Sequence, residues 1–350
     1  MVSAINLFAI VLLGSASLGG FLVWDGRRLL RAAAVIAVAL VATTALARGA
    51  LALFVDTTYR KDQYLMQMRL PAALVPSVVL PRLPVAGCPV ADSRPTIERL
   101  RARGSLRVGF VPDTVPYAFV NASGDLVGFD LELADGLAFD LGVGQLELVP
   151  VSWQNVGAAL RECRIDAMLS VPLTLVRPGD MHFSAPYLDT VVALAVRDER
   201  RHEFANAAAL RALASLTVGL PETGNVAESR VIDLFRGTPA LFVRYDKPRD
   251  FFEGTMPQVD ALLMRAEAAA SWSLLYPNYA FIVPAHAPQV PLVVGLRPGD
   301  LQLAAFVDNW LMIQNAEGRL EKARQYWMLG HSREATAQAR WSIRRNVLNW

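Results

Sequence analysis

The sequence has few cysteines and no excess of charge, and each shortage excludes a class of protein. Its 350 residues include two cysteines, too few to form a common zinc site by themselves. The 34 basic residues nearly balance the 32 acidic ones, and after residue 55 the counts are 30 and 31. This balance excludes the basic footprint of a nucleic-acid binder. The sequence also lacks a catalytic triad, a metal-ligand spacing and a phosphate loop, so we expect neither a cofactor nor an enzyme.

Apolar residues, in contrast, are abundant, and they concentrate at the start of the chain. Hydrophobic residues make up 53% of the sequence and the mean hydropathy is +0.32. Residues 4–24 carry no charge, and residues 32–55 carry only Arg48. Each run exceeds the roughly 20 residues that cross a membrane core. The sequence predicts a transmembrane hairpin over residues 1–55, with spans at about 4–24 and 32–54.

A cleavable signal peptide is the alternative for the first run. Residues 1–3 contain no basic residue, the run is longer than a normal signal-peptide core, and a second span follows directly. We therefore favour two spans. The turn at residues 25–31 contains Arg27, Arg28 and Arg31, which the positive-inside rule assigns to the cytoplasm. Both chain ends are then expected on the periplasmic side of the inner membrane.

Residues 56–94 are expected to form a proline-rich linker. Prolines recur at positions 71, 76, 81, 84 and 89, a pattern typical of an extended, semi-rigid spacer. Within it, residues 56–70 are expected to include a short interfacial helix, because Tyr64, Leu65 and Met68 cluster on one side.

From residue 95 the pattern alternates between strands and helices. The first unit has expected strands at residues 106–110, 146–150 and 165–170, and the second at 216–220, 241–245 and 260–264. A βαβ rhythm implies parallel sheets with ligands at the carboxyl ends of the strands. We predict an α/β fold with lobes at residues 95–190 and 191–288, a return to the first lobe at 289–332, and a tail at 333–350. Hinges are expected at residues 187–195 and 282–292.

Several motifs carry a resemblance to a known family. They are Leu106-Arg107-Val108-Gly109-Phe110, Pro116-Tyr117-Ala118-Phe119, Gly128-Phe129-Asp130, Ile165-Asp166-Ala167, Thr174-Leu175-Val176-Arg177 and Phe183-Ser184-Ala185-Pro186-Tyr187. In this order, over residues 97–330, the sequence resembles the family 3 extracellular solute-binding proteins. The resemblance implies a two-lobed periplasmic-binding-protein-like (type II) domain for polar amino acids and similar solutes, here preceded by two transmembrane α-helices.

A looser resemblance covers the whole chain. The hairpin, the spacer, the stretch Trp272-Ser273-Leu274-Leu275-Tyr276-Pro277 and the ending Trp341-Ser342-Ile343 resemble the C-terminal part of fusions between a cation:dicarboxylate symporter and a family 3 binding domain. The symporter core is absent from this sequence. The resemblance implies a split or truncated version of that arrangement.

Arg177 is the residue expected to bind a solute carboxylate. Its guanidinium offers a bidentate fork that matches a carboxylate, and the resemblance assigns that role to an arginine three residues after a threonine. Thr174 and Ser170 are expected to add hydroxyl hydrogen bonds. The alternative is that Arg177 is a solvated loop residue.

The second lobe is expected to supply the other half of the carboxylate clamp. The strand at residues 216–220 runs into Thr223, Gly224 and Asn225 before a helix, where backbone N–H groups and a helix N-terminus attract anions. The alternative is that Thr223 or Asn225 only caps this helix.

The ammonium partner is assigned to Glu267. Arg265 stands where the resembled family has its acid, and Asp260 lies at the start of its strand, away from the cleft edge. A surface position for the acid is the alternative, and Arg265 could instead indicate a dicarboxylate. Among the aromatic residues that could close the site, Tyr117 is expected to approach the cleft.

The two cysteines are expected to form a disulfide. Cys88 and Cys163 both lie outside the cytoplasm in the predicted topology and near the amino-terminal edge of the first sheet, opposite the cleft. A pair of unlinked thiols is the alternative.

Together these patterns predict a membrane-anchored protein that captures a small solute, an amino acid or a dicarboxylate, for an integral membrane transporter. The alternatives are a sensory receptor that signals to a membrane partner, a dehydratase-like enzyme on the same fold, and a non-binding structural subunit.

Overall fold

The computed structural model describes residues 19, 26–54, 59–85, 96–173, 180–221, 232, 235–285 and 287–332. By its internal contacts the chain divides into two units, residues 1–59 and 60–350.

The first unit contains the helix α2, Gly26–Phe54, which has 29 residues. Its alanines and leucines are strong helix formers and no proline interrupts them. The helix begins earlier than expected, so the predicted turn at residues 25–31 is wrong: Arg27 and Arg28 lie in the first helical turn. None of the helices in the described part of the chain combines the length and the apolar run that a membrane crossing needs. The predicted span 4–24, except residue 19, lies outside the described residues.

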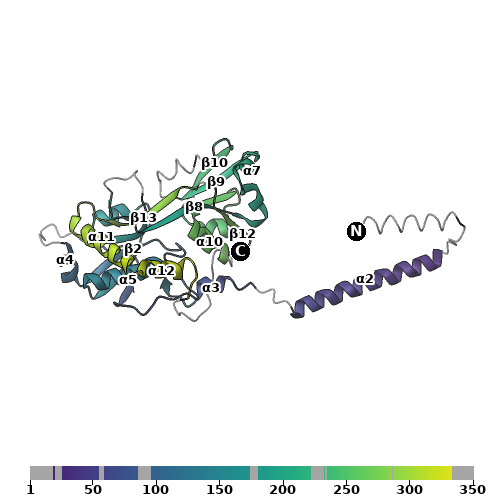
Figure 1. Ribbon diagram of the computed structural model, residues 1–350, viewed down its shortest axis with the longest axis horizontal. Coiled ribbons are helices and arrows are strands. Elements are labelled where there is room, and N and C mark those ends of the chain that lie inside the picture. The colour runs from purple at the N-terminus through teal and green to yellow at the C-terminus, as the bar shows by residue number, and fades with distance from the viewer. Residues whose placement is uncertain are drawn as a thin grey trace. The chain divides into compact units, whose positions relative to one another are not determined.

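The second unit is an α/β structure in which all the described strands except β3 and β4 belong to one mixed sheet (Figure 1). Its helices are α3 (Asp62–Met66), α4 (Thr96–Arg103), α5 (Phe129–Leu141), α6 (Val156–Arg161), η1 (Asp198–Phe204), α7 (Ala207–Arg211), α9 (Pro248–Phe252), α10 (Ala266–Leu275), α11 (Leu301–Ala316) and α12 (Arg319–Trp327). Its strands are β1 (Ser77–Val79), β2 (Ser105–Phe110), β3 (Phe119–Val120), β4 (Leu126–Val127), β5 (Gln145–Pro150), β6 (Ala167–Pro172), β7 (His182–Phe183), β8 (Leu188–Arg197), β9 (Leu216–Pro221), β10 (Ala240–Tyr245), β11 (Ala261–Arg265), β12 (Tyr279–Ile282) and β13 (Gln289–Leu296). The short strands β3 and β4 pair only with each other.

The strand order β1-β5-β2-β6-β13-β8-β11-β9-β10 separates into two halves. In the first, β1, β5, β2 and β6 are parallel. In the second, β11, β9 and β10 are parallel. The antiparallel strands β8 and β13 join the halves, and Figure 1 shows them running side by side between the lobes. These crossing strands overlap the two segments, residues 187–195 and 282–292, where the sequence places the hinges.

Strand β6 of the first lobe and strand β11 of the second begin in the same way. In each case the aspartate directly before the strand binds a neighbouring strand. Asp166 accepts a hydrogen bond from the Arg107 backbone N–H at 2.8 Å and is also bound by Arg103. Asp260 accepts from the Thr217 N–H at 2.8 Å, and Arg200 donates to it as well. Both aspartates therefore stabilise the edge of the sheet where the strands begin.

The backbone conformation just before α5 requires the glycine of the Gly128-Phe129-Asp130 motif. Gly128 has a φ of +146°, and a Cβ there would stand 2.0 Å from the Tyr117 carbonyl oxygen. Only glycine tolerates this approach. The Asp130 N–H donates to the same carbonyl at 3.0 Å, so the motif fixes the start of α5 against the segment that contains Tyr117.

The proline-rich linker differs from the expected free spacer over residues 60–80. Helix α3 packs against α10 of the second lobe, and β1 pairs in parallel with β5 of the first. Leu65 and Met68 are fully buried, and the Arg69 backbone hydrogen-bonds the Tyr326 hydroxyl in both directions. The burial of two large apolar side chains explains why this segment joins the domain rather than remaining extended.

Cys163 lies in the turn between α6 and β6, and it is disulfide-bonded. The turn precedes the amino-terminal end of β6, at the edge of the sheet expected from the sequence. Cys88, the other cysteine of the sequence, lies outside the described residues, and its pairing with Cys163 stays a prediction.

Candidate ligand-binding cleft

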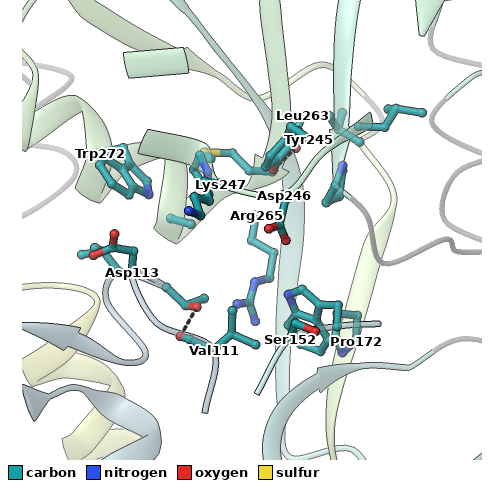
Figure 2. A pocket seen from close by; sticks show the side chains of 18 of the residues that line it. Val111, Asp113, Ser152, Pro172, Tyr245, Asp246, Lys247, Leu263, Arg265 and Trp272 are labelled. Atoms are coloured by element: carbon teal, nitrogen blue, oxygen red, sulfur yellow. Dashed lines mark hydrogen bonds between the residues drawn. The ribbon is translucent and has the colours of Figure 1, made fainter. Parts of the chain in front are cut away.

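A cavity of about 300 Å³ lies between the two lobes. The first lobe contributes Val111 and Asp113 after β2, Ser152 after β5 and Pro172 at the end of β6; the second contributes Pro221 at the end of β9, Asp246 and Lys247 after β10, and Arg265 at the end of β11. Figure 2 shows side chains converging from both sides. The cavity thus lies at the carboxyl ends of the parallel strands, where open α/β sheets bind their ligands.

Arg265 reaches across the cleft from the second lobe. Its guanidinium carbon lies 3.8 Å from the centre of the Tyr117 ring, a cation–π contact. Its Nη1 donates to the Ser170 carbonyl oxygen at 3.3 Å. Figure 2 shows the side chain extending into the space between the lobes. Two first-lobe residues therefore hold this cation in place at the cavity wall.

Behind Arg265, a buried carboxyl belongs to a hydroxyl network. The Ser170 hydroxyl donates to Asp130 Oδ1 and lies 3.1 Å from the Tyr187 hydroxyl, which also accepts from the Ser170 N–H at 2.8 Å. Burial raises the pKa of Asp130 to about 7, and the hydrogen bond from Ser170 and the charge of Arg265 oppose the rise. The network therefore occupies the Ser170 hydroxyl that the sequence assigns to solute binding.

An ion pair bridges the lobes at another part of the cavity. Arg249 of α9 donates from Nε and Nη2 to the two carboxylate oxygens of Asp113, both at 3.0 Å. The same guanidinium lies 5.3 Å from the centre of the Trp272 ring, which stacks on Phe252 at 5.0 Å. Asp113 is thus neutralised by a cation of the opposite lobe.

Five predicted site residues lie outside the described part of the chain: Thr174, Arg177, Thr223, Gly224 and Asn225. The residues that border these two segments are informative, because Pro172 and Pro221 both line the cavity. The predicted carboxylate clamp stays a prediction.

The three described site residues, Tyr117, Ser170 and Glu267, are absent from the cavity lining. Tyr117 is fully buried and supports Arg265 with its ring, while Ser170 is bound in the Asp130 network. Glu267 lies in the first turn of α10, and the Thr190 hydroxyl donates to its carboxylate. Burial raises the pKa of Glu267. The structure gives no support to a solute contact by any of the three, and such a contact stays a prediction.

The sequence reasoning did not select several cavity residues, among them Asp246, Lys247, Trp272 and Arg265. Asp246 and Lys247 directly follow the predicted strand at residues 241–245, so the rule that ligands bind at strand carboxyl ends would have found them. The sequence offers Trp272 among the aromatic residues that could close the site, but it favours Tyr117, since most buried aromatic residues belong to a core. Within the described ranges no cluster of histidine, cysteine, aspartate or glutamate could hold a metal ion.

Two α/β lobes, two crossing strands and an interlobe cavity define a two-lobed solute-binding protein of the type II fold. A profile of the bacterial extracellular solute-binding proteins, family 3, matches residues 106–330. The chain belongs to this family, as the motifs predicted.

Relatives in this family include an enzyme and a binding protein. The cyclohexadienyl dehydratase of Pseudomonas aeruginosa is 26% identical over 240 residues, which cover 66% of this chain and 85% of the relative. The L-cystine-binding protein TcyJ of Escherichia coli K12 is 25% identical over 234 residues, with the same two coverages.

Solved structures give the same picture. The ancestral amino acid-binding protein AncCDT-1, a precursor of cyclohexadienyl dehydratase, matches with a TM-score of 0.58 at 25% identity, over 67% of this chain and 99% of that one. The substrate-binding protein AbpA of Streptococcus pneumoniae, bound to L-arginine, matches with a TM-score of 0.56 at 25% identity, over 65% and 95%.

Proposed function

We propose that this protein captures an amino acid or a related small carboxylate by closing its two lobes around it, and delivers it to a membrane transporter. The observation that carries the proposal is the interlobe cavity at the strand carboxyl ends, with Arg265 held at its wall. Hinged closure around a ligand is the usual motion of such proteins. The family membership and the amino acid-binding relatives support the same function.

A thermal-shift screen tests this proposal. Residues 60–350, the second unit, are purified and heated with each proteinogenic amino acid and with small dicarboxylates. A solute present at 100 times its Kd stabilises the folded state by about 2.7 kcal/mol, so a true ligand raises the melting temperature in a concentration-dependent way. If no small carboxylate at millimolar concentration moves the melting temperature, the binding function is contradicted.

A dehydratase-like enzyme is the second candidate, and the P. aeruginosa relative favours it. Dehydration needs a general acid beside the leaving hydroxyl. Burial raises the pKa of both Asp130 and Glu267, but each is hydrogen-bonded to a buried hydroxyl and neither lines the cavity. Loss of water from a cyclohexadienol produces an aromatic ring, so ultraviolet absorbance distinguishes turnover from binding.

The proposal includes a membrane tether with the binding domain on the periplasmic side. It is supported by the sequence of residues 4–24 and 32–54 and by the apolar side chains of α2, among which Val35 and Ile36 are each 67% exposed. A reporter fused after Trp350 is expected to be active only outside the cytoplasm, and one inserted at Gly26 only inside. A cytoplasmic C-terminus contradicts the receptor role.

A sensory role is the alternative that the linker favours. Residues 60–80 connect the N-terminal unit to the domain, and they contact the second lobe through α3 and the first through β1. A relative movement of the lobes must therefore act on this segment. Hydrogen exchange that changes at residues 62–70 on solute addition supports signalling, and unchanged exchange there supports a passive tether.

A further inference from the structure

We infer that the cleft selects solutes with two acidic groups, and that Arg265 binds the second one. The inference rests on the proposed binding function and deepens it, because it names the chemical class of the solute and the residue that distinguishes it.

The Arg265 guanidinium has N–H groups that the described residues do not use as hydrogen-bond donors. A guanidinium has five N–H donors, and among the described residues one of them is used, for the Ser170 carbonyl oxygen. No described carboxylate pairs with Arg265, whose other contact is the face of the Tyr117 ring. Arg265 is half-buried at the cavity wall, where the Tyr117 ring and the Ser170 carbonyl hold it in place. The edge of its guanidinium that carries the unused N–H groups is therefore preorganised to bind a carboxylate.

The charges around the cavity favour an anion. The described lining residues include the cations Arg244, Lys247 and Arg265 and the anions Asp113 and Asp246. Asp113 is the carboxylate that a basic solute would seek, but both of its oxygens are bound by Arg249. Arg244 already donates to the Pro221 carbonyl oxygen at 3.0 Å. Among the other charged lining residues, Lys247 and Arg265 are positive and Asp246 is negative, a net positive balance that attracts an anionic solute.

The remaining groups suit a small solute with an apolar middle. A cavity of about 300 Å³ is at the lower end of ligand pockets. Trp272 and Val111 supply apolar wall. Asp246 also lines the cavity, so the structure offers a carboxylate to an ammonium group as well. Acidic amino acids and plain dicarboxylates share the required chemistry, which is two carboxylates a few bonds apart.

Calorimetric titration of the full-length protein in detergent tests the inference with matched pairs of solutes. L-Glutamate is compared with L-glutamine and L-aspartate with L-asparagine, pairs that differ only in the second acid. Glutarate and succinate distinguish a dicarboxylate site from an acidic amino acid site. We expect at least one diacid to bind tenfold or more tightly than its amide, and L-arginine to bind more weakly than either.

Arg265→Gln is the decisive variant, and it is expected to reduce the acid-to-amide ratio to within twofold. Arg265→Lys keeps the charge without the fork and should retain part of the ratio. Arg319→Gln, on α12 and outside the cavity lining, is the control and should leave the ratio unchanged. Melting temperatures of the unliganded variants show whether each is folded, and the wild-type ratio does not depend on any variant.

The outcomes separate this inference from the proposed function. If the wild-type protein binds amides as tightly as acids, the inference is overturned and the binding function stands. If a diacid preference survives Arg265→Gln in a folded variant, Arg265 is not its source and the inference is overturned. If no small carboxylate of any kind binds, both the inference and the proposed function are lost.

Discussion

The two lobes are built alike at one edge and differ at the other. At the edge where strands begin, Asp166 and Asp260 perform the same task, each binding the backbone N–H of a neighbouring strand. At the edge where strands end, the described first-lobe wall is mostly apolar and its one carboxylate, Asp113, is already paired, whereas the second lobe presents Asp246, Lys247 and Arg265. The comparison indicates that the base of each lobe maintains the fold, and that the charged groups open to a solute lie mainly on the second-lobe rim.

The largest expected effect concerns the buried carboxyl behind the rim. The pKa of Asp130 rises from 3.8 to about 7 on folding. Because the folded state holds this proton more tightly than the unfolded state, its stabilising contribution is present below about pH 4 and is lost as the pH rises through 7. The difference corresponds to about 4 kcal/mol.

Asp130→Asn removes this titration. Measured by urea unfolding from pH 3 to pH 8, the variant should gain about 4 kcal/mol relative to wild type across the range. Asp125→Asn, at an exposed carboxyl in the β3–β4 turn, is the control. If the unfolding free energies of wild type and Asp130→Asn change in parallel with pH, folding does not raise the pKa of Asp130 and this prediction is wrong.

The first-lobe rim is tested by Arg177, which lies outside the described residues. If it binds the solute carboxylate, Arg177→Ala costs about 2 to 5 kcal/mol of binding free energy, at least tenfold in affinity. The domain should remain folded, since the residue is assigned to the cleft rather than the core. Unchanged affinity by calorimetric titration removes Arg177 from the site and leaves the second lobe as the main source of binding.

The shared base of the two lobes is tested by a pair of variants. Asp166→Asn and Asp260→Asn each weaken a charge-assisted hydrogen bond to a strand N–H, and each should lower the unfolding free energy by about 1 to 3 kcal/mol. Solute affinity should change less than twofold in both. A tenfold loss of affinity in only one of them would show that the two aspartates are not equivalent.

The smallest effect is expected from the ion pair across the cleft. Asp113 and Arg249 are 45% and 41% exposed, and exposed pairs contribute about 0.2 to 1 kcal/mol. Arg249→Met should therefore weaken solute binding by at most about fivefold. A loss above tenfold would mean that Arg249 contacts the solute itself.

Much of the fold could be predicted because its strands are short buried apolar runs. The predicted strand at residues 241–245 differs from β10 by one residue, and the predicted strand at residues 106–110 differs from β2 by one residue. The linker could not be predicted in this way. Its prolines are typical of a spacer, and its docking depends on α10, against which α3 packs, and on Tyr326, both far along the chain.

The site was less predictable than the fold for the same reason. The sequence marks Arg265 as a departure from the family, but its role depends on Tyr117, which lies 148 positions earlier and is brought beside it only by the packing of the two lobes. The sequence favours Glu267 over Asp260 as the ammonium partner, but it does not show which side of a helix start faces a cavity.

A crystal structure of residues 60–350 with the tightest solute of the thermal-shift screen tests the central claim most directly. We predict one solute between the lobes, with a carboxylate on the free edge of the Arg265 guanidinium and its apolar part against Trp272. A solute bound outside this cavity, or a cavity that stays empty when the solute is present far above its Kd, would contradict the claim.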